Sequence, residues 1–225
     1  MSNLQPLPDN QTTYMGKPVF ISSIDENVEG VEFVSLVDQP AVQYNWMAFS
    51  AQQPIKKPQF FADVERRIIT GVLMLADTPI YRIDEETGEE YFVVFRKQDI
   101  ESIVKRFAAE GYHNKVNLMH QQAGKVNGVD AVPGGVYMIE SMIVDSSRGV
   151  KAPDKFAEVT EGSWIGSYYV ESDEVWNDLV KDGTVRGFSV EGMFNMWMKT
   201  PAPTGDKFAE IEGLLSVLNE LEKMS

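Results

Sequence analysis

A catalytic mechanism based on histidine has few candidates in this chain, because the sequence contains only two histidines. His120 ends the largely apolar run of residues 116–119, which predicts it at the end of a strand. A free imidazole titrates near neutral pH, and a histidine at a strand end is well placed to act as a general base. A hydrogen-bonded strand histidine is the alternative. His113 is expected to be a solvated loop residue.

Ser189 stands between two glycines, Gly187 and Gly192, inside an apolar strand-like segment. Glycine within a strand indicates a bulge or the close approach of another backbone. A nucleophilic serine needs such open surroundings, because a substrate carbonyl must reach its Oγ. The two-residue period of a strand places Glu191 on the same face as Ser189. On spacing alone, a glycine-kinked core strand with a hydrogen-bonded hydroxyl is the more frequent outcome, and the spacing is not that of the Gly-x-Ser-x-Gly elbow of hydrolases.

Glu140 is the only acid within the strand-like residues 136–144. A carboxylate among apolar residues is costly unless it has a partner, and an imidazolium would be one. A half-exposed sheet that turns Glu140 toward solvent is the commoner arrangement. Asp145, at the end of this segment, is expected to be a turn residue.

The sequence predicts neither a metal site nor an organic cofactor. The acidic residues between 84 and 90 lack the spacing of a calcium loop and are expected at a solvated hairpin tip. No phosphate loop or dinucleotide fingerprint is present. The lack of cysteine excludes disulfides, thiolate zinc sites and a cysteine nucleophile.

The formal net charge of −14 makes direct nucleic-acid binding unfavourable, since the sequence shows no basic patch larger than a pair such as Arg66-Arg67. No apolar run is long enough to cross a bilayer, and the first residues lack the features of a signal peptide. A soluble, cytoplasmic-type protein without membrane contact is therefore expected.

Hydrophobic periodicity predicts seven strands and three helices. The strands are expected over residues 67–76, 80–83, 91–95, 116–120, 136–144, 163–170 and 185–198. Helices are expected over residues 98–110, after the cap residue Ser172, and over residues 206–223. This order lacks regular βαβ alternation, so we expect a mainly antiparallel sheet or barrel of about six or seven strands with helices outside.

Three regions are expected along the chain. Residues 1–60 are rich in proline and polar residues and predict an extended arm and linker that is weakly packed or tied to a partner. Residues 61–200 form the barrel domain, and residues 201–225 contain a leucine-rich helix that docks on the barrel or on a partner.

Several segments, in their order, resemble the XkdF-type phage serine proteases, relatives of the prohead maturation proteases of tailed phages. The segments are Phe33-Val34-Ser35-Leu36-Val37-Asp38-Gln39-Pro40-Ala41-Val42, Gly71-Val72-Leu73-Met74 with Pro79-Ile80-Tyr81-Arg82, Asn117-Leu118-Met119-His120, Ile139-Glu140-Ser141, Gly162-Ser163-Trp164, Val175-Trp176 and Gly187-Phe188-Ser189-Val190-Glu191-Gly192. The likeness spans about residues 31–197. It implies a fold related to the herpesvirus assembly proteases, a β-barrel ringed by helices.

The resemblance implies a serine endopeptidase that acts inside the prohead in the host bacterial cytoplasm. Scaffold and major capsid protein precursors would be its partners and substrates, together with the chain itself, and a homodimer or higher homo-oligomer is expected. By position, Ser189 matches the nucleophile of the family and His120 its general base. Residues 190–225 are shorter than the scaffold-like tail of many such proteases, which fits either self-processing or a short gene.

The third catalytic residue is left open between two acids. The herpesvirus relatives use a second histidine, which this chain lacks after Ser189, so an acid is expected to orient His120. Glu140 is the first choice and Glu191 the second, because Glu191 would crowd the nucleophile. A non-catalytic capsid- or scaffold-associated protein is the alternative function.

Overall fold

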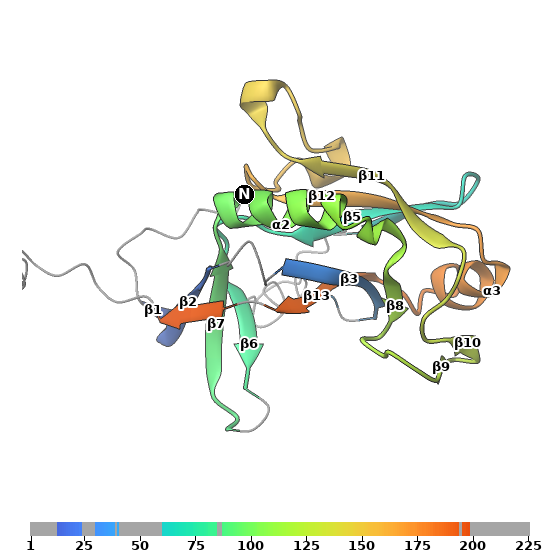
Figure 1. The fold of residues 1–225 in the computed structure, drawn as a ribbon, viewed down its shortest axis with the longest axis horizontal. Helices are drawn as coiled ribbons and strands as arrows, with labels where there is room; N and C mark the ends of the chain where they lie inside the picture. The colour runs from blue at the N-terminus through green and yellow to red at the C-terminus, as the bar shows by residue number, and fades with distance from the viewer. Residues whose placement is uncertain are drawn as a thin grey trace, which may run out of the picture.

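The computed structural model describes residues 13–23, 30–38, 40, 60–84, 87–193 and 195–198. This part of the chain is mainly β, with fourteen strands in four sheets and one long helix (Figure 1). None of its helices is long and apolar enough to cross a lipid bilayer.

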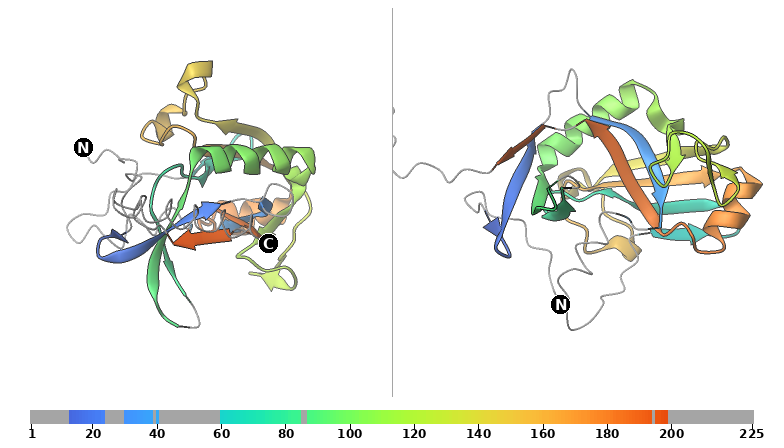
Figure 2. Two further views of the ribbon diagram at one scale, coloured as in Figure 1. Left: turned by 60° about the vertical axis from the view of Figure 1, so that its left-hand side comes forward. Right: turned by 90° about the horizontal axis from the view of Figure 1, so that it is seen from below.

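Two of the sheets face each other and hold the core between them. The four-stranded sheet has the order β11 (Val136–Ile143), β12 (Trp164–Val170), β5 (Ile68–Met74), β4 (Phe60–Asp63). The three-stranded sheet has the order β13 (Gly187–Met193), β3 (Gly30–Val37), β8 (Val116–Leu118). Figure 1 shows the first sheet above the second. In the lower sheet β13 runs antiparallel to β3 and β8 runs parallel to it, and Figure 2 shows β3 and β13 side by side.

The remaining strands form smaller units. A five-stranded sheet has the order β1 (Thr13–Tyr14), β2 (Lys17–Ser23), β7 (Glu90–Phe95), β6 (Ile80–Ile83), with β14 (Asn195–Met198) also on β2. A small hairpin joins β9 (Lys125–Val126) and β10 (Val129–Asp130). The expected hairpin of β6 and β7 is confirmed by their antiparallel pairing.

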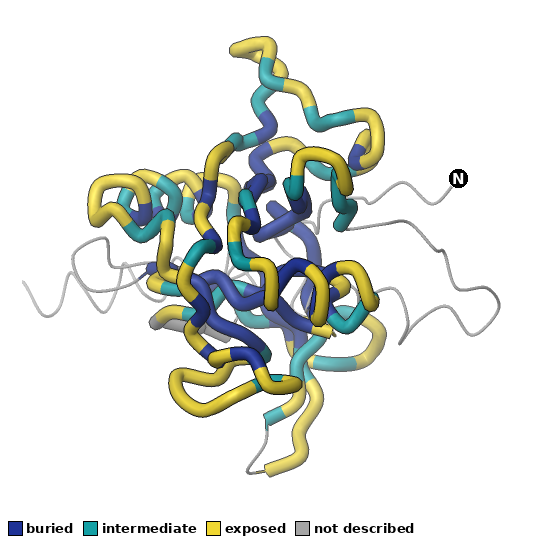
Figure 3. Tube along the Cα trace, turned by 90° about the vertical axis from the view of Figure 1, so that its right-hand side faces the viewer, coloured by how far each residue is buried: buried dark blue, intermediate teal, exposed yellow. Residues whose placement is uncertain are grey.

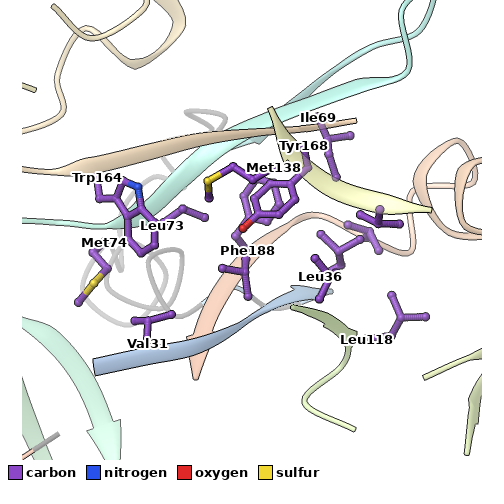
Figure 4. Packing of buried hydrophobic residues seen from close by; sticks show 14 of the residues in the cluster. Val31, Leu36, Ile69, Leu73, Met74, Leu118, Met138, Trp164, Tyr168 and Phe188 are labelled. Atoms are coloured by element: carbon purple, nitrogen blue, oxygen red, sulfur yellow. The ribbon is translucent and has the colours of Figure 1, made fainter. Parts of the chain in front are cut away.

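The core consists of apolar side chains that alternate strand positions direct into the space between the two facing sheets. Trp164, Tyr168 and Met138 reach from the upper sheet toward Leu36 and Phe188 of the lower one (Figure 4). The rings of Tyr168 and Phe188 are 5.2 Å apart between centroids. Figure 3 shows the buried segments running through the middle of the molecule, with exposed loops around them. Burying each such side chain contributes roughly 1.5–3 kcal/mol relative to leaving it in water.

The long helix, α2 (Lys97–Ala109), confirms the predicted apolar face. Ile100, Ile103 and Phe107 are buried on it, and the Phe107 ring lies 5.1 Å from that of Trp164. Gly111 follows with a φ of 70°, a conformation that glycine adopts without strain. The helix thus closes one side of the core.

Short helical turns occupy the connections. Ser172 Oγ accepts a hydrogen bond from the Val175 amide and caps α3 (Asp173–Val175), as predicted. The chain then continues as a π-helical turn, η4 (Trp176–Val180). Three 3-10 turns complete the set: η1 (Tyr112–Asn114), η2 (Ser146–Arg148) and η3 (Asp154–Phe156).

The expected barrel surrounded by helices is wrong. None of the four sheets among the described residues closes on itself, because β11 and β4 remain the two edges of one sheet and β13 and β8 those of another. Closure needs the first and last strands of one sheet to pair, and here the strands divide between separate sheets. α2 and the one-turn α3 are the α-helices of this part, too few to ring a barrel.

The expected weak packing of the N-terminal region is also wrong for residues 30–37. These residues form β3, the middle strand of the three-stranded sheet, with Val34 and Leu36 fully buried. Its partners are supplied by β8 and β13, far along the sequence, so local composition could not reveal the pairing. Residues 1–12 and 41–59 of the expected arm and the expected leucine-rich helix lie outside the described residues.

Candidate active site

Three polar side chains form a row across the three-stranded sheet. Ser189 on β13 is paired in register with Ser35 on β3, and Ser35 is paired with Asn117 on β8. Their neighbours Phe188 and Leu36 point into the core. Because side chains alternate along a strand, the row lies on the opposite face of the sheet. Of the two serines, Ser35 is fully buried, whereas Ser189 retains 8% exposure.

His120 reaches this row from a tight turn just after β8. Met119 and His120 both adopt positive φ values, 51° and 59°, which non-glycine residues rarely do. The Met119 amide donates to the Leu36 carbonyl and the Gln121 amide donates to the Leu118 carbonyl, which fixes the turn. Such local strain persists only where the surrounding structure holds it, and it often occurs at functional sites.

The imidazole of His120 lies against both Ser35 and Glu191. Its Nδ1 is 3.2 Å from Ser35 Oγ and 3.2 Å from Glu191 Oε1. The side chain is 47% exposed, so the ring is held at one nitrogen and still accessible to solvent. Sequence reasoning placed His120 at a strand end, and the structure places it in the turn that follows.

Glu191 Oε1 is the point at which the polar groups converge. It accepts hydrogen bonds from the Ser35 hydroxyl and, at 2.7 Å, from Asn117 Nδ2, while Gln122 Nε2 donates to the other oxygen at 3.2 Å. Partial burial raises the pKa of Glu191, but the hydrogen bonds from Ser35 and Asn117 and the nearby His120 outweigh this and lower it. The carboxyl group is therefore held as a carboxylate.

Neither glycine that brackets Ser189 leaves room for a Cβ: at Gly192 the close neighbour is backbone, as predicted, whereas at Gly187 it is the side chain of Pro40. The register between β13 and β3 shifts at Glu191 and Gly192, which marks a bulge. A Cβ on Gly192 would lie 1.8 Å from the Gly30 carbonyl oxygen. A Cβ on Gly187 would lie 2.5 Å from Pro40 Cγ.

Glu140 lies away from these residues. It sits on β11 of the other sheet, is exposed, and is paired in register with Ser167 of β12. Ser167 is bonded to Thr70, whereas its neighbour Tyr168 points into the core between the sheets. By strand alternation Glu140 therefore lies on the far side of the four-stranded sheet from Ser189.

His113 and Asp145, which the sequence placed outside the site, lie in short turns. His113 was expected to be a solvated loop residue, but it is half-buried in η1 with its ring 5.8 Å from that of Phe107. Asp145 accepts hydrogen bonds from the Ser147 and Arg148 amides, which confirms its expected place in a turn. No cluster of metal-ligating side chains occurs within the described ranges.

Three residues of the site were not singled out from the sequence: Ser35, Asn117 and Gln122. Ser35 interrupts the apolar run 33–37, and Asn117 interrupts 116–119. A polar residue inside a short apolar strand is the signal that could have found them, because a buried polar group needs a partner. Which partner it has depends on strand pairing.

This arrangement can support general base catalysis. A proton on Nδ1 of His120, shared with Glu191 Oε1, leaves Nε2 with a free lone pair. Ser189 lies directly opposite Ser35, and such paired positions have Cβ atoms about 4.5–5.5 Å apart. No hydrogen bond joins Ser189 to His120 in the described part of the chain, and catalytic hydrogen bonds are often long before substrate binds.

No protein-family model, curated protein or solved structure matches this chain.

Proposed function

We propose that the protein is a serine endopeptidase in which Ser189 is the nucleophile, His120 the general base and Glu191 the acid that orients His120. The observation that carries this proposal is the contact of His120 Nδ1 with Glu191 Oε1, which leaves Nε2 available on a partly exposed ring. A serine–histidine–acid site needs this tautomer. The separation of Glu140 from the site favours Glu191 as the third member.

The proposed reaction proceeds through an acyl-enzyme. Ser189 Oγ attacks the carbonyl carbon of a peptide bond while His120 Nε2 takes the hydroxyl proton. The imidazolium is stabilised by the carboxylate of Glu191 and then gives the proton to the leaving amine as the C–N bond breaks. Water, deprotonated by the same nitrogen, hydrolyses the ester and restores Ser189. The chemistry needs no metal or organic cofactor.

The biological role that we propose is maturation of a phage prohead, and it rests on the sequence resemblance. Scaffold and major capsid protein precursors, and the chain itself, are the proposed substrates, encountered inside the prohead in the bacterial cytoplasm. Confinement there raises the protein concentration and favours even a weak homodimer. The net charge of −14 would keep the enzyme away from DNA.

A non-catalytic capsid- or scaffold-associated protein is the second candidate function. The observation that favours it is the low exposure of Ser189, together with a polar row that could serve only to hold the three strands together. In that case the hydroxyl of Ser189 would be dispensable for every activity of the protein.

Intact-mass spectrometry of the full chain and of Ser189→Ala, each incubated with scaffold and capsid precursors, separates the two functions. We expect defined fragments from the wild type and none from the variant, with both proteins folded by circular dichroism. Equal fragments from both would refute Ser189 as nucleophile. No cleavage by either, also in the presence of assembled proheads, would favour the non-catalytic function.

A further inference from the structure

We propose that Ser35 is a positioning residue, whose buried hydroxyl fixes the proton of the His120 imidazole on Nδ1 and secures the carboxylate of Glu191. The catalytic consequence rests on the proposed function, whereas the effect on the imidazole proton does not. Nothing in the spacing of the sequence singles out Ser35, because its neighbours come from β8 and β13.

Burial separates the role of Ser35 from that of Ser189. Ser35 is fully buried, and its strand is flanked by β13 on one side and β8 on the other. A substrate carbonyl therefore has no path to Ser35 Oγ. Ser189, in the neighbouring edge strand, keeps a small exposed fraction. Ser35 therefore contacts the proposed general base, His120, and does not contact the substrate.

The other hydrogen bonds of Ser35 determine which atom donates in its contact with His120. Asn117 Nδ2 donates to Glu191 Oε1, so Asn117 Oδ1 faces Ser35 and can only accept. Glu191 Oε1 also only accepts, and the single hydroxyl proton of Ser35 is directed to these two oxygens. The Ser35 lone pairs remain for His120 Nδ1, 3.2 Å away.

Two acceptors consequently face one nitrogen of the ring. Ser35 Oγ and Glu191 Oε1 are both 3.2 Å from His120 Nδ1, which favours a proton there and leaves Nε2 unprotonated. Removing the Ser35 hydroxyl deletes one acceptor for Nδ1 and one donor to Glu191. The loss of a hydrogen bond to a charged group is expected to lower the rate of cleavage roughly ten- to hundredfold.

The closing experiment compares Ser35→Ala with Ser167→Ala. Ser167 is a matched control, since it is a buried serine in a central strand whose hydroxyl bonds to Thr70 and, among the described residues, to no charged group. Two-bond ¹H–¹⁵N correlation spectra report which ring nitrogen carries the proton. The chain has only two histidines, so His113 serves as an internal reference. Cleavage kinetics are measured on the same samples.

We expect the wild type and Ser167→Ala to show His120 protonated on Nδ1 when the ring is neutral, and Ser35→Ala to show a mixture of the two forms. The kcat should fall by about ten- to hundredfold in Ser35→Ala with KM unchanged, because the residue cannot touch substrate. An unchanged His120 spectrum in Ser35→Ala would overturn the proposal. If Ser35→Ala does not fold, a wild-type ring protonated mainly on Nε2 would overturn it equally. A changed spectrum in a protein that cleaves nothing would support the positioning role and refute the peptidase function.

Discussion

Two sheets of this molecule each carry a buried polar pair on neighbouring strands, and the two pairs have different surroundings. In the four-stranded sheet, Ser167 and Thr70 are paired in register and their hydroxyls are 2.9 Å apart. In the three-stranded sheet, Ser35 and Asn117 are also paired in register and bonded to each other. The two hydroxyls of the first pair bond to each other. The second pair makes further polar contacts with Glu191 and with the exposed imidazole of His120. Burial and pairing are common to both, so connection to an accessible titratable group is what distinguishes the candidate site.

The largest expected effect concerns Ser189 and His120. Ser189→Ala and His120→Ala should each lower the cleavage rate by at least about a thousandfold, because the nucleophile or its base is lost. Their free energies of unfolding should change by less than about 2 kcal/mol. Cleavage assays and urea unfolding check both statements. Severe unfolding of His120→Ala would indicate a structural histidine instead.

The two acids should differ sharply in their effect on rate. Glu191→Gln removes the charge that orients His120 and should reduce kcat by roughly a hundred- to ten-thousandfold. Glu140→Gln, on the exposed outer face of the other sheet, should change kcat by less than about twofold. Steady-state kinetics of both variants decide between them. A larger fall in kcat for Glu140→Gln than for Glu191→Gln would identify Glu140 as the third catalytic residue.

The bulge beside the site makes a prediction about stability. Gly192→Ala places a Cβ against the Gly30 carbonyl and should destabilise the fold by about 3 kcal/mol, since backbone must shift. Gly134→Ala is the control, because a Cβ there meets no atom within 4 Å. Thermal unfolding of both variants measures the difference. Equal midpoints would show that the two strands can separate without cost.

The lowered pKa of Glu191 predicts a smaller, pH-dependent effect. A carboxyl group whose folded pKa lies below its ordinary value of 4.5 stabilises the fold above that value. This contribution is lost as the pH falls through the lower folded pKa. Urea unfolding from about pH 6 to about pH 3 should therefore show a steeper acid loss of stability in the wild type than in Glu191→Gln. Parallel curves would contradict a hydrogen-bonded carboxylate.

The smallest effect is expected in the core shared by the two sheets. The buried hydroxyl of Tyr168 has no hydrogen-bond partner among the described residues, and burial raises the pKa of Tyr168 well above its ordinary value. Tyr168→Phe should leave stability unchanged or raise it by up to about 1 kcal/mol, because an unsatisfied polar group is removed. Chemical denaturation checks this against Tyr169→Phe. A loss above about 1 kcal/mol would reveal a hydrogen bond of that hydroxyl.

The sequence predicted the local elements of the described residues better than their assembly. β5, the hairpin of β6 and β7, α2 and the cap at Ser172 were all expected, because periodicity and capping are local signals. The barrel was wrong because strand partners are set by packing between distant segments. The close approach at Gly192 was predicted from type and spacing alone.

In the candidate site, too, the local features were predicted and those that depend on strand pairing were not. Residue type and local spacing single out His120, Ser189 and Glu191 as candidates, the resemblance supplies the roles expected of Ser189 and His120, and the structure brings His120 and Glu191 into contact. Glu140 is the first choice from the resemblance, because the Ile139-Glu140-Ser141 segment belongs to the family pattern, but β11 belongs to the other sheet and carries it on the outer face. The sequence does not show that Ser35 and Asn117 belong to the site, because their contacts with His120 and Glu191 depend on the register of β3 with β8 and β13.

The most direct test of the central claim is covalent labelling with a fluorophosphonate, which reacts with serines activated by a neighbouring base. Peptide mapping of the labelled full chain identifies the modified residue without knowledge of the substrate. We predict a single label on Ser189, absent from His120→Ala and strongly reduced in Glu191→Gln. A label on any other serine, or equal labelling of Ser189 in wild type and His120→Ala, would contradict the proposed nucleophile and base.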